Sequence, residues 1–309
     1  MSHKDVCILI PTLNEEDAVA EVIGEFRAMG FEEILVIDGH SRDRTCELAR
    51  AAGARVVVQS GHGKGQALKE AFSLIDSEQI VMIDGDGTYL PAEVGLLLDP
   101  ILEGRADQVM GNRFGNLQRG ALTRLNSTGN RLINFFFRII YGVPLNDILT
   151  GYRAFTRSGI DRLDLTMAGF EIETEMTVDS VKKGLAIAEV PITYRSRTKG
   201  TRTKLNPVMD GARIIVTIYR MAKTHNPLFY FGLMGSFFGM AGFLMGLYVL
   251  REWLSTRTEH IPLTILTSLL IIVGFQLFFM GILGDAVALM HREVLREIYK
   301  NRKRNEKEK

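Results

Sequence analysis

The first part of the chain alternates short apolar runs with polar, glycine-containing segments. Val6–Ile10 is continuously apolar and ends at Pro11, and comparable runs follow later in the chain. Short runs of this kind are typical of parallel strands that are covered on both faces. The predicted strands are Val6–Ile10, Glu33–Ile37, Arg55–Gln59 and Ile80–Ile83.

Segments with helical spacing lie between these runs. Apolar positions recur three and four residues apart in Arg42–Ala52 and Gly65–Ile75, which favours helices that bury one face. A further helix is expected to begin at Glu15, with Asn14 as its cap. Repeated strand–helix units predict an α/β domain with a mostly parallel, doubly wound sheet flanked by helices.

From Leu228 onward the pattern changes to two long apolar stretches, 228–250 and 262–283, neither of which contains a charged residue. A bilayer core requires about 20 helical residues, so the stretches predict two spans joined as a hairpin. Buried core helices are the alternative, although such helices rarely lack a polar face over this length. The predicted organisation is a domain at 1–225, a transmembrane hairpin at 226–290 and a charged tail at 291–309.

The distribution of charged residues predicts how the hairpin is oriented in the membrane. Basic residues lie on both outer flanks of the hairpin, whereas the charges of its connecting segment cancel. The positive-inside rule therefore predicts a multi-pass protein of the cell membrane, with both termini and the large domain in the cytoplasm. The flanking basic residues are Arg213, Arg220, Lys223, Arg292, Arg296, Lys300, Arg302, Lys303 and Arg304.

Other bulk properties exclude some classes of protein. The net charge of +1 over 309 residues gives no support for a nucleic-acid binder. Cys7 and Cys46 lack metal-ligand spacing and are expected to be reduced thiols. The N-terminal residues show no secretory signal.

Each predicted strand is followed by a cluster of polar residues. These clusters are PTLNE, DGHSRD, GHGKG and DGDGT. Ligands of doubly wound sheets bind at the carboxyl ends of the strands. The clusters are therefore expected to meet at one edge of the sheet and form a site.

Asp84 and Asp86, separated by one glycine, are the most informative pair in these clusters. Two carboxylates at a strand end can hold Mg²⁺ or Mn²⁺ while leaving positions open for phosphate oxygens. A surface turn is the alternative for an isolated D-G-D. The apolar IVMI before the pair and GTYLP after it favour the metal site.

Other side chains suit the recognition of phosphate or ribose. GHGKG begins a predicted helix, where freed backbone amides and the Lys64 ammonium would favour phosphate, although the P-loop pattern is absent. Asp38 is suited to ribose or base, and a loop aspartate is the alternative. His62 is expected to be an ordinary loop histidine. Further candidates are Arg113, Arg119, Arg124, Arg131, Asp147 and Arg153, with a cluster at Arg195, Arg197, Lys199, Arg202 and Lys204 that also suits lipid headgroups.

Taken together, these residues resemble the dolichyl-phosphate (polyprenyl-phosphate) sugar synthases, inverting glycosyltransferases of the GT-A fold, and most of all the archaeal members that begin N-glycan assembly. PTLNE, IDGHSRDRT, GKGQALKEAF, DGDGT, GNRF, NDILTGYRAF and TKL occur in the order of the family's motifs. The resemblance implies a GT-A (Rossmann-like) fold, with Asp84 and Asp86 at the metal. It assigns Pro11, Thr12, Asn14, Glu15, Asp38, Gly39, Lys64 and Asp84 to the donor, and Arg113, Arg124, Asp147 and Lys204 to diphosphate, acceptor phosphate or catalysis.

The resemblance also implies the reaction. Sugar would pass, with inversion, from a nucleotide-sugar (UDP-sugar rather than GDP-mannose) to dolichyl or polyprenyl phosphate in the bilayer, and the product would serve protein glycosylation. Thr88 stands where several members of the family have glutamine, which leaves the metal ligands open. Alternatives are transfer to a glycolipid or polysaccharide, and a non-catalytic nucleotide-sugar-binding membrane protein. A homo-oligomer is compatible with the sequence.

Overall fold

The computed structural model describes residues 5–118, 121–169, 171–196, 211, 214–219 and 226–307, with the side chains of Arg124, 291–293 and 295–307 outside the description. The chain forms two compact units, Met1–Ile218 and Tyr219–Lys309.

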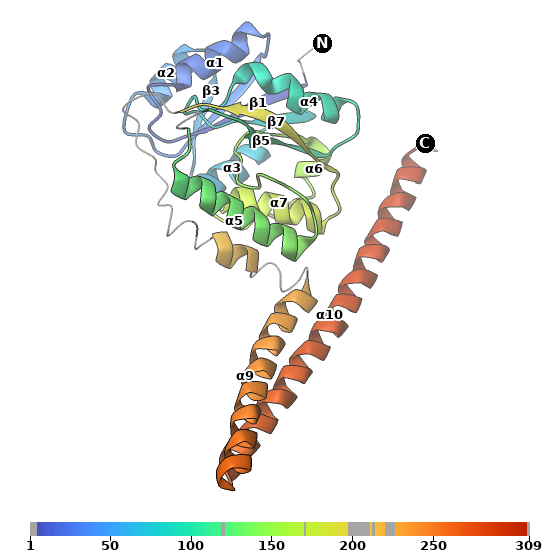
Figure 1. Cartoon of the computed structure of the whole chain (residues 1–309). Coiled ribbons are helices and arrows are strands. Elements are labelled where there is room, and N and C mark those ends of the chain that lie inside the picture. Colours follow the sequence, from blue (N-terminus) through green and yellow to red (C-terminus); the bar gives the residue numbers. More distant parts are fainter. Residues whose placement is uncertain are drawn as a thin grey trace. The chain divides into compact units, whose positions relative to one another are not determined.

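A mixed sheet lies at the centre of the first unit (Figure 1). Within the described residues it has seven strands in the order β3-β2-β1-β4-β6-β5-β7. Only β6 runs antiparallel to its neighbours, β4 and β5, and the other pairs are parallel. The strands are β1 Val6–Thr12, β2 Glu33–Asp38, β3 Arg55–Val58, β4 Gln79–Met82, β5 Gln108–Leu117, β6 Arg153–Thr156 and β7 Ile187–Tyr194.

Helices cover both faces of this sheet. One face carries α1, α2 and α4, and the other carries α3, α6 and α7 (Figure 1). The helices are α1 Val19–Ala28, α2 Thr45–Ala51, α3 Lys64–Ser73, the short 3₁₀ helix η1 Pro91–Glu93, α4 Val94–Leu102, α5 Arg124–Tyr141, α6 Arg157–Ile160 and α7 Ile172–Lys182.

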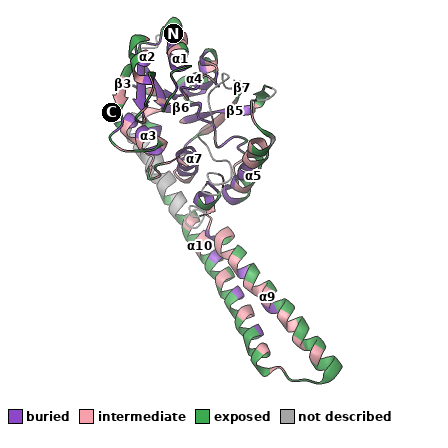
Figure 2. Ribbon diagram, turned by 90° about the vertical axis from the view of Figure 1, so that its left-hand side faces the viewer, coloured by how far each residue is buried: buried purple, intermediate pink, exposed green. Residues whose placement is uncertain are grey.

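The side chains of β1 show why the apolar runs are continuous. Ile8 and Ile10 belong to the core beneath α1 and α4, whereas Cys7 and Leu9 belong to the core beneath α3 and α7. Successive residues of a strand point to opposite faces, and all four of these side chains are buried. The colouring of Figure 2 shows that the central strands of the sheet consist mainly of buried residues. The predicted mostly parallel α/β fold is confirmed.

The predicted start of the first helix is wrong. The helix begins at Val19, and its cap residue Ala18 makes no side-chain cap hydrogen bond. Asn14 instead has a positive φ of 50°, and its Oδ1 accepts from the backbone N–H of Arg42. The Asn14 side chain therefore ties two loops together rather than capping a helix.

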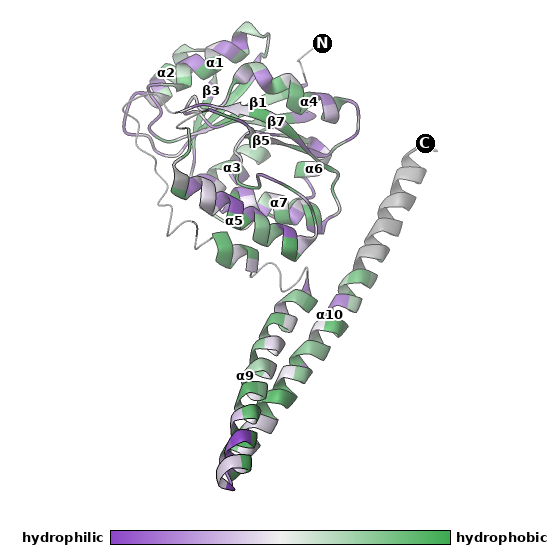
Figure 3. Ribbon diagram, viewed as in Figure 1, coloured by the Kyte–Doolittle hydropathy of each residue, from purple (hydrophilic) through white to green (hydrophobic). Residues whose placement is uncertain are grey.

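The second unit contains two long helices, α9 Pro227–Thr256 and α10 Ile261–Lys307. Two segments, Pro227–Thr256 and Ile261–Met290, are long and apolar enough to cross a membrane, as the hydropathy colouring of Figure 3 illustrates. They form a candidate transmembrane hairpin, as the sequence predicted. The helical backbone of α10 continues through most of the segment that was predicted as a separate tail.

Glycines allow the two helices to pack closely. A Cβ at Gly235 would lie 2.7 Å from the carbonyl oxygen of Gly274, and a Cβ at Gly274 would lie 2.8 Å from the amide nitrogen of Gly239. Both separations are too short for real atoms, so only glycine permits this approach. The backbones of α9 and α10 are therefore in direct contact across the hairpin.

Candidate active site

The carboxyl ends of β1 and β2 bring the first predicted residues together. Thr12 is opposite Asp38 in the parallel register, and its Oγ1 donates to Asp38 Oδ1 at 3.1 Å. The backbone N–H of Gly39 donates to the Thr12 carbonyl at 2.8 Å. Pro11 precedes Thr12 on the same strand, so these four predicted residues form one small cluster.

The loop that follows β1 is held against the loop before α2. The backbone N–H groups of Asn14 and Glu15 donate to Ser41 Oγ and Thr45 Oγ1, both at 2.8 Å. Ser41 in turn donates to both carboxylate oxygens of Asp38. Glu15 is buried. Asn14 and Glu15 thus lie beside the cluster at Thr12 and Asp38.

Asp84, directly beyond β4, is joined to the predicted Lys64. The Lys64 ammonium lies 2.6 Å from Asp84 Oδ1 and 2.6 Å from Glu173 Oε1. Burial lowers the pKa of Lys64, but the charges of Asp84 and Glu173 outweigh burial and raise it overall. Lys64 is therefore a permanent cation between two carboxylates. Glu173, on α7, was not predicted.

Asp86 completes the predicted carboxylate pair and is buried. Its Oδ1 accepts from the backbone N–H and the hydroxyl of Thr88. Gly85, between the two aspartates, packs on Thr12, because a Cβ there would lie 2.9 Å from Thr12 Cγ2. The D-G-D segment and the cluster at β1 and β2 therefore share one edge of the sheet.

The carboxylates at this edge suit a divalent metal that is also bound by the phosphates of a substrate. Among the described residues, no group of three or more His, Cys, Asp or Glu side chains is arranged to hold an ion. Asp84 and Asp86 supply two carboxylates, and Asp84 already binds a cation. Mg²⁺ is commonly held by one or two carboxylates together with substrate phosphates, and the two aspartates fit that arrangement.

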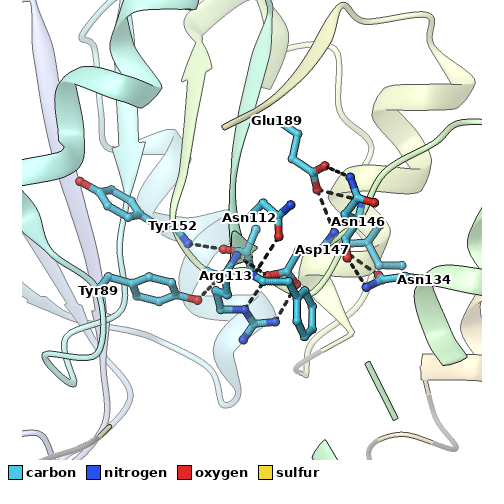
Figure 4. Close-up of polar contacts among 12 residues, drawn as sticks. Tyr89, Asn112, Arg113, Asn134, Asn146, Asp147, Tyr152 and Glu189 are labelled. Atoms are coloured by element: carbon cyan, nitrogen blue, oxygen red, sulfur yellow. Dashed lines mark hydrogen bonds and ion pairs between the residues drawn. The ribbon is translucent and has the colours of Figure 1, made fainter. Parts of the chain in front are cut away.

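Two further predicted residues, Arg113 and Asp147, form a buried ion pair with each other (Figure 4). Arg113 Nε and Nη2 donate to the two Asp147 oxygens at 2.7 Å, and its backbone N–H donates to Oδ2 at 3.0 Å. Burial lowers the pKa of Arg113, whereas Asp147 raises it and prevails. The backbone N–H of Asp147 also donates to Glu189 on β7. A bidentate pair of this kind fixes the plane of the guanidinium.

Tyr89 lies between the two charged clusters. Its hydroxyl accepts from the backbone N–H of Gly151 at 2.9 Å, and its ring is 5.1 Å from that of Tyr194, over which Arg113 lies. Gly151 also abuts Asp84, because a Cβ at this position would overlap the Asp84 carboxylate. The loop at Gly151 therefore connects the Asp84 and Arg113 clusters.

Arg153 is fully buried and binds backbone more than side chains. It donates to the carbonyls of Ile148 and Thr150 and to the hydroxyl of Thr177. Burial lowers the pKa of Arg153 to about 10, and the nearby charges of Glu173 and Asp147 offset part of this effect. Its role is to hold the loop that carries Asp147 and Gly151.

The glycines of GHGKG were expected to free backbone amides for phosphate, but the amide of Gly65 is already bound. The Gly65 N–H donates to the Ala168 carbonyl at 2.9 Å, so this amide is not free for phosphate. A Cβ at Gly63 would overlap the same carbonyl, which shows that the glycines allow close packing on the 166–169 segment. His62 lies in this loop with its ring 4.9 Å from that of His40.

Six predicted residues cannot be placed with the others. Arg124 begins α5, but its side chain is outside the described part. Lys204 lies outside the described residues, as do Arg119, Arg197, Lys199 and Arg202. Arg131 is exposed on α5.

The described domain resembles a solved enzyme structure. It aligns with glucosyl-3-phosphoglycerate synthase from Mycobacterium tuberculosis, crystallised with Mn²⁺, UDP-glucose and phosphoglyceric acid. The TM-score is 0.60 and the identity 25%, over 70% of this chain and 79% of that one. This fold, with a carboxylate pair beyond β4, defines a glycosyltransferase.

Residues 7–163 match the model of glycosyl transferase family 2. The chain belongs to that family. It is 47% identical over 294 residues to glycosyltransferase AglJ of Haloferax volcanii, covering 95% of this chain and 97% of that protein. It is 34% identical over 221 residues to the dolichyl-phosphate hexose transferase of the same organism, covering 70% and 93%. The predicted family and enzyme class are confirmed.

Proposed function

We propose that this glycosyltransferase moves a sugar, with inversion, from a nucleotide-sugar to dolichyl or polyprenyl phosphate at the cytoplasmic membrane face. The observation that carries the proposal is that two fixed cations, Lys64 beside Asp84 and Arg113 beside Asp147, are linked through Tyr89 and Gly151 at one edge of the sheet. Such an edge suits two anions, a donor diphosphate and an acceptor phosphate. The name of the dolichyl-phosphate hexose transferase agrees with this acceptor.

The donor is assigned to the cluster at β1, β2 and β4. Thr12 and Asp38 would bind the nucleoside, and Asp84 and Asp86 would hold a divalent metal on the diphosphate. When bound, that metal would neutralise the leaving group. We favour a UDP-sugar, because the aligned synthase was crystallised with UDP-glucose and Mn²⁺.

The acceptor is assigned to Arg113. Its Nε and Nη2 bind Asp147, so Nη1 is the atom that would donate to the lipid phosphate. A phosphate monoester is ionised at neutral pH and is itself the nucleophile, so no strong general base is required. The protein's task is to hold two mutually repelling anions in line for displacement.

The test uses the full chain in detergent, with a panel of labelled UDP- and GDP-sugars, dolichyl phosphate, and Mn²⁺ or Mg²⁺. We expect metal-dependent label in the organic phase from one donor. Asp86→Asn should reduce transfer about a hundredfold, whereas Asp76→Asn, at an exposed aspartate, should not. Full activity of Asp86→Asn would refute the metal assignment.

Transfer to an acceptor other than a lipid phosphate would change the proposal. The aligned synthase was crystallised with phosphoglyceric acid, a small phosphorylated acid. If label passes to phosphoglycerate, glycolipid or polysaccharide and never to a lipid phosphate, the polyprenyl-phosphate proposal is wrong.

A further inference from the structure

The carboxyl end of β7 is attached to the loop that follows the D-G-D segment. Tyr194, the last residue of β7, forms an isolated antiparallel bridge with Tyr89. The backbone N–H of Arg195 donates to the Thr88 carbonyl at 2.8 Å. Thr88 and Tyr89 follow closely after Asp86 in the chain. The backbone of β7 is therefore bound to the loop that carries the Asp86 carboxylate.

Thr88 extends this attachment to the Asp86 carboxylate itself. The Thr88 side chain is buried, and its backbone N–H and hydroxyl donate to Asp86 Oδ1 at 3.1 and 2.6 Å. Several of the sugar synthases that the chain resembles have glutamine at this position. Here the threonine hydroxyl supports a carboxylate of the proposed metal site, while the carbonyl of the same residue holds the end of β7.

The side chain of Tyr194 lies against Arg113. The Cζ atom of Arg113 is 5.3 Å from the centroid of the Tyr194 ring, within the separation of about 6 Å at which a cation is attracted to an aromatic face. Asp147 binds Nε and Nη2 of the same guanidinium. Two contacts of different kinds therefore orient this guanidinium, and with it Nη1, the atom assigned above to the acceptor phosphate.

An aromatic ring can orient Arg113 without cancelling its charge. Burial raises the pKa of the Tyr194 phenol above its usual value, the Arg113 charge and a hydrogen bond with Thr88 oppose this rise, and the Asp86 charge adds to it. The phenol is therefore neutral at physiological pH. A second carboxylate in its place would weaken the attraction of Arg113 for phosphate, because Asp147 already balances one positive charge.

This arrangement bears on the reaction, in so far as the proposed function holds. The donor diphosphate would lie at Asp84 and Asp86, beyond β4, whereas the acceptor phosphate would lie at Arg113 on β5. Displacement requires the two in line, and a misplacement of about 1 Å can cost about a hundredfold in rate. Tyr194 contacts both sides, the loop after Asp86 through its backbone and Arg113 through its ring.

We propose that Tyr194 is a positioning residue that fixes the Arg113 guanidinium relative to Asp86 and so sets the distance between the acceptor phosphate and the metal-bound donor. The aromatic ring, rather than the apolar volume of the side chain, performs this role. Tyr194 also packs against the core beneath α1 and α4. Leucine keeps an apolar side chain at this position without an aromatic face, and phenylalanine keeps the ring, so these two variants separate the contributions.

The first test needs no transfer. The full chain in detergent, with Mn²⁺ and either UDP or GDP, is saturated with a short, water-soluble prenyl phosphate, and paramagnetic relaxation of its ³¹P signal reports the distance from Mn²⁺ to the phosphorus. This relaxation depends on the inverse sixth power of the distance, so in Tyr194→Leu a displacement of about 1 Å should change it about twofold. Tyr194→Phe should match the unmodified chain.

The matched control for this measurement is Thr193→Val on the same strand. Thr193 binds Glu93 through its backbone N–H, which valine retains, so the relaxation should not change. Equal relaxation in Tyr194→Leu and Tyr194→Phe would overturn the proposal. A prenyl phosphate that does not bind, or that binds without relaxation by Mn²⁺, would overturn it as well.

The second test uses transfer and therefore also rests on the proposed function. Tyr194→Leu should lower kcat/KM for the prenyl phosphate about tenfold, with the Kd of the nucleotide and the melting temperature unchanged. Tyr194→Phe loses only the hydroxyl near Thr88 and should lower kcat/KM about threefold at most. An equal loss in both variants, or no loss in Tyr194→Leu, contradicts the role of the ring. Absence of transfer by the unmodified chain refutes the proposed function, and the relaxation measurement then decides on Tyr194.

Discussion

Lys64 is bound by two carboxylates from different elements, Asp84 beyond β4 and Glu173 on α7. The net charge of Lys64, Asp84 and Glu173 together is −1, and the Lys64 ammonium binds Asp84 Oδ1. A divalent metal that binds Asp84 must compete with this ammonium. Glu173 weakens that competition, because it offers Lys64 a second partner.

Removing this second partner should make the metal harder to bind. In Glu173→Gln, Lys64 would pair with Asp84 alone, so we expect the metal concentration for half-maximal activity to rise about tenfold, or about 1.4 kcal/mol. Transfer measured over a Mn²⁺ titration checks this. The control is Glu171→Gln, a less buried glutamate on the same segment. An unchanged metal requirement would mean that Glu173 only supports the fold.

The reactivity of the Cys46 thiol depends on its burial and on the nearby charge of Asp38. Partial burial, with the Asp38 charge next, raises the pKa of its thiol from 9.0 to about 11. A raised pKa means less reactive thiolate at a given pH. At pH 8 we expect alkylation about a hundredfold slower than for an ordinary thiol, increasing as the pH approaches 11. Mass spectrometry of the folded and unfolded chain measures it. Equal rates in both states would contradict the pKa shift.

The sequence located the residues that follow strands and missed those that depend on tertiary packing. Thr12, Asp38 and Asp84 were predictable, because parallel strands end at a common edge. Glu173 and Tyr89 reach the site from the start of α7 and from the loop before η1. No spacing rule connects these positions with Lys64 or Gly151. The acid-rich EIETE run, buried from Ile172 to Glu175, was the available signal for Glu173.

At the scale of elements, the apolar runs predicted four strands to within one or two residues at each end. The orientation of β6 was not predictable from its sequence. β6 contains only Arg153–Thr156 and pairs antiparallel with both neighbours. The cap assigned to Asn14 failed because Arg42 offered its side chain a tertiary donor.

Gly274 is the position at which the hairpin packing can be tested. A side chain there meets the backbone of α9, so Gly274→Leu should separate the helices. We expect disulfide formation between Gly246→Cys and Thr267→Cys, whose side chains would be in contact, to slow about tenfold. Gly232→Leu is the control, because its Cβ meets nothing within 4 Å. Unchanged cross-linking would show that the helices do not need this approach.

At the scale of the molecule, the sequence predicted a domain at 1–225, a hairpin at 226–290 and a tail at 291–309, whereas the chain divides into two compact units, Met1–Ile218 and Tyr219–Lys309. The first unit has a core on each side of its sheet, so it buries apolar surface without help from the hairpin. The second unit leaves most large apolar side chains exposed, among them Phe237, Phe243 and Phe279. Exposure of this extent suits lipid rather than water. The sequence could not give the boundary more closely, because residues near it are mixed in character.

Removing the second unit should leave nucleotide binding intact and reduce transfer to a lipid acceptor. A chain truncated after residue 225 keeps both cores and the clusters at Thr12, Asp38 and Asp84, so we expect its affinity for the nucleotide to stay within about threefold. Transfer to long-chain polyprenyl phosphate in vesicles should fall about a hundredfold, because the hairpin no longer raises the local concentration of enzyme at the bilayer. Recruiting the truncated chain with a histidine tag and nickel-chelating lipid distinguishes two roles of the hairpin. Recovered transfer means that the hairpin acts as a tether, whereas continued loss means that its helices contribute to binding the acceptor. Full transfer without recruitment would contradict both roles of the hairpin.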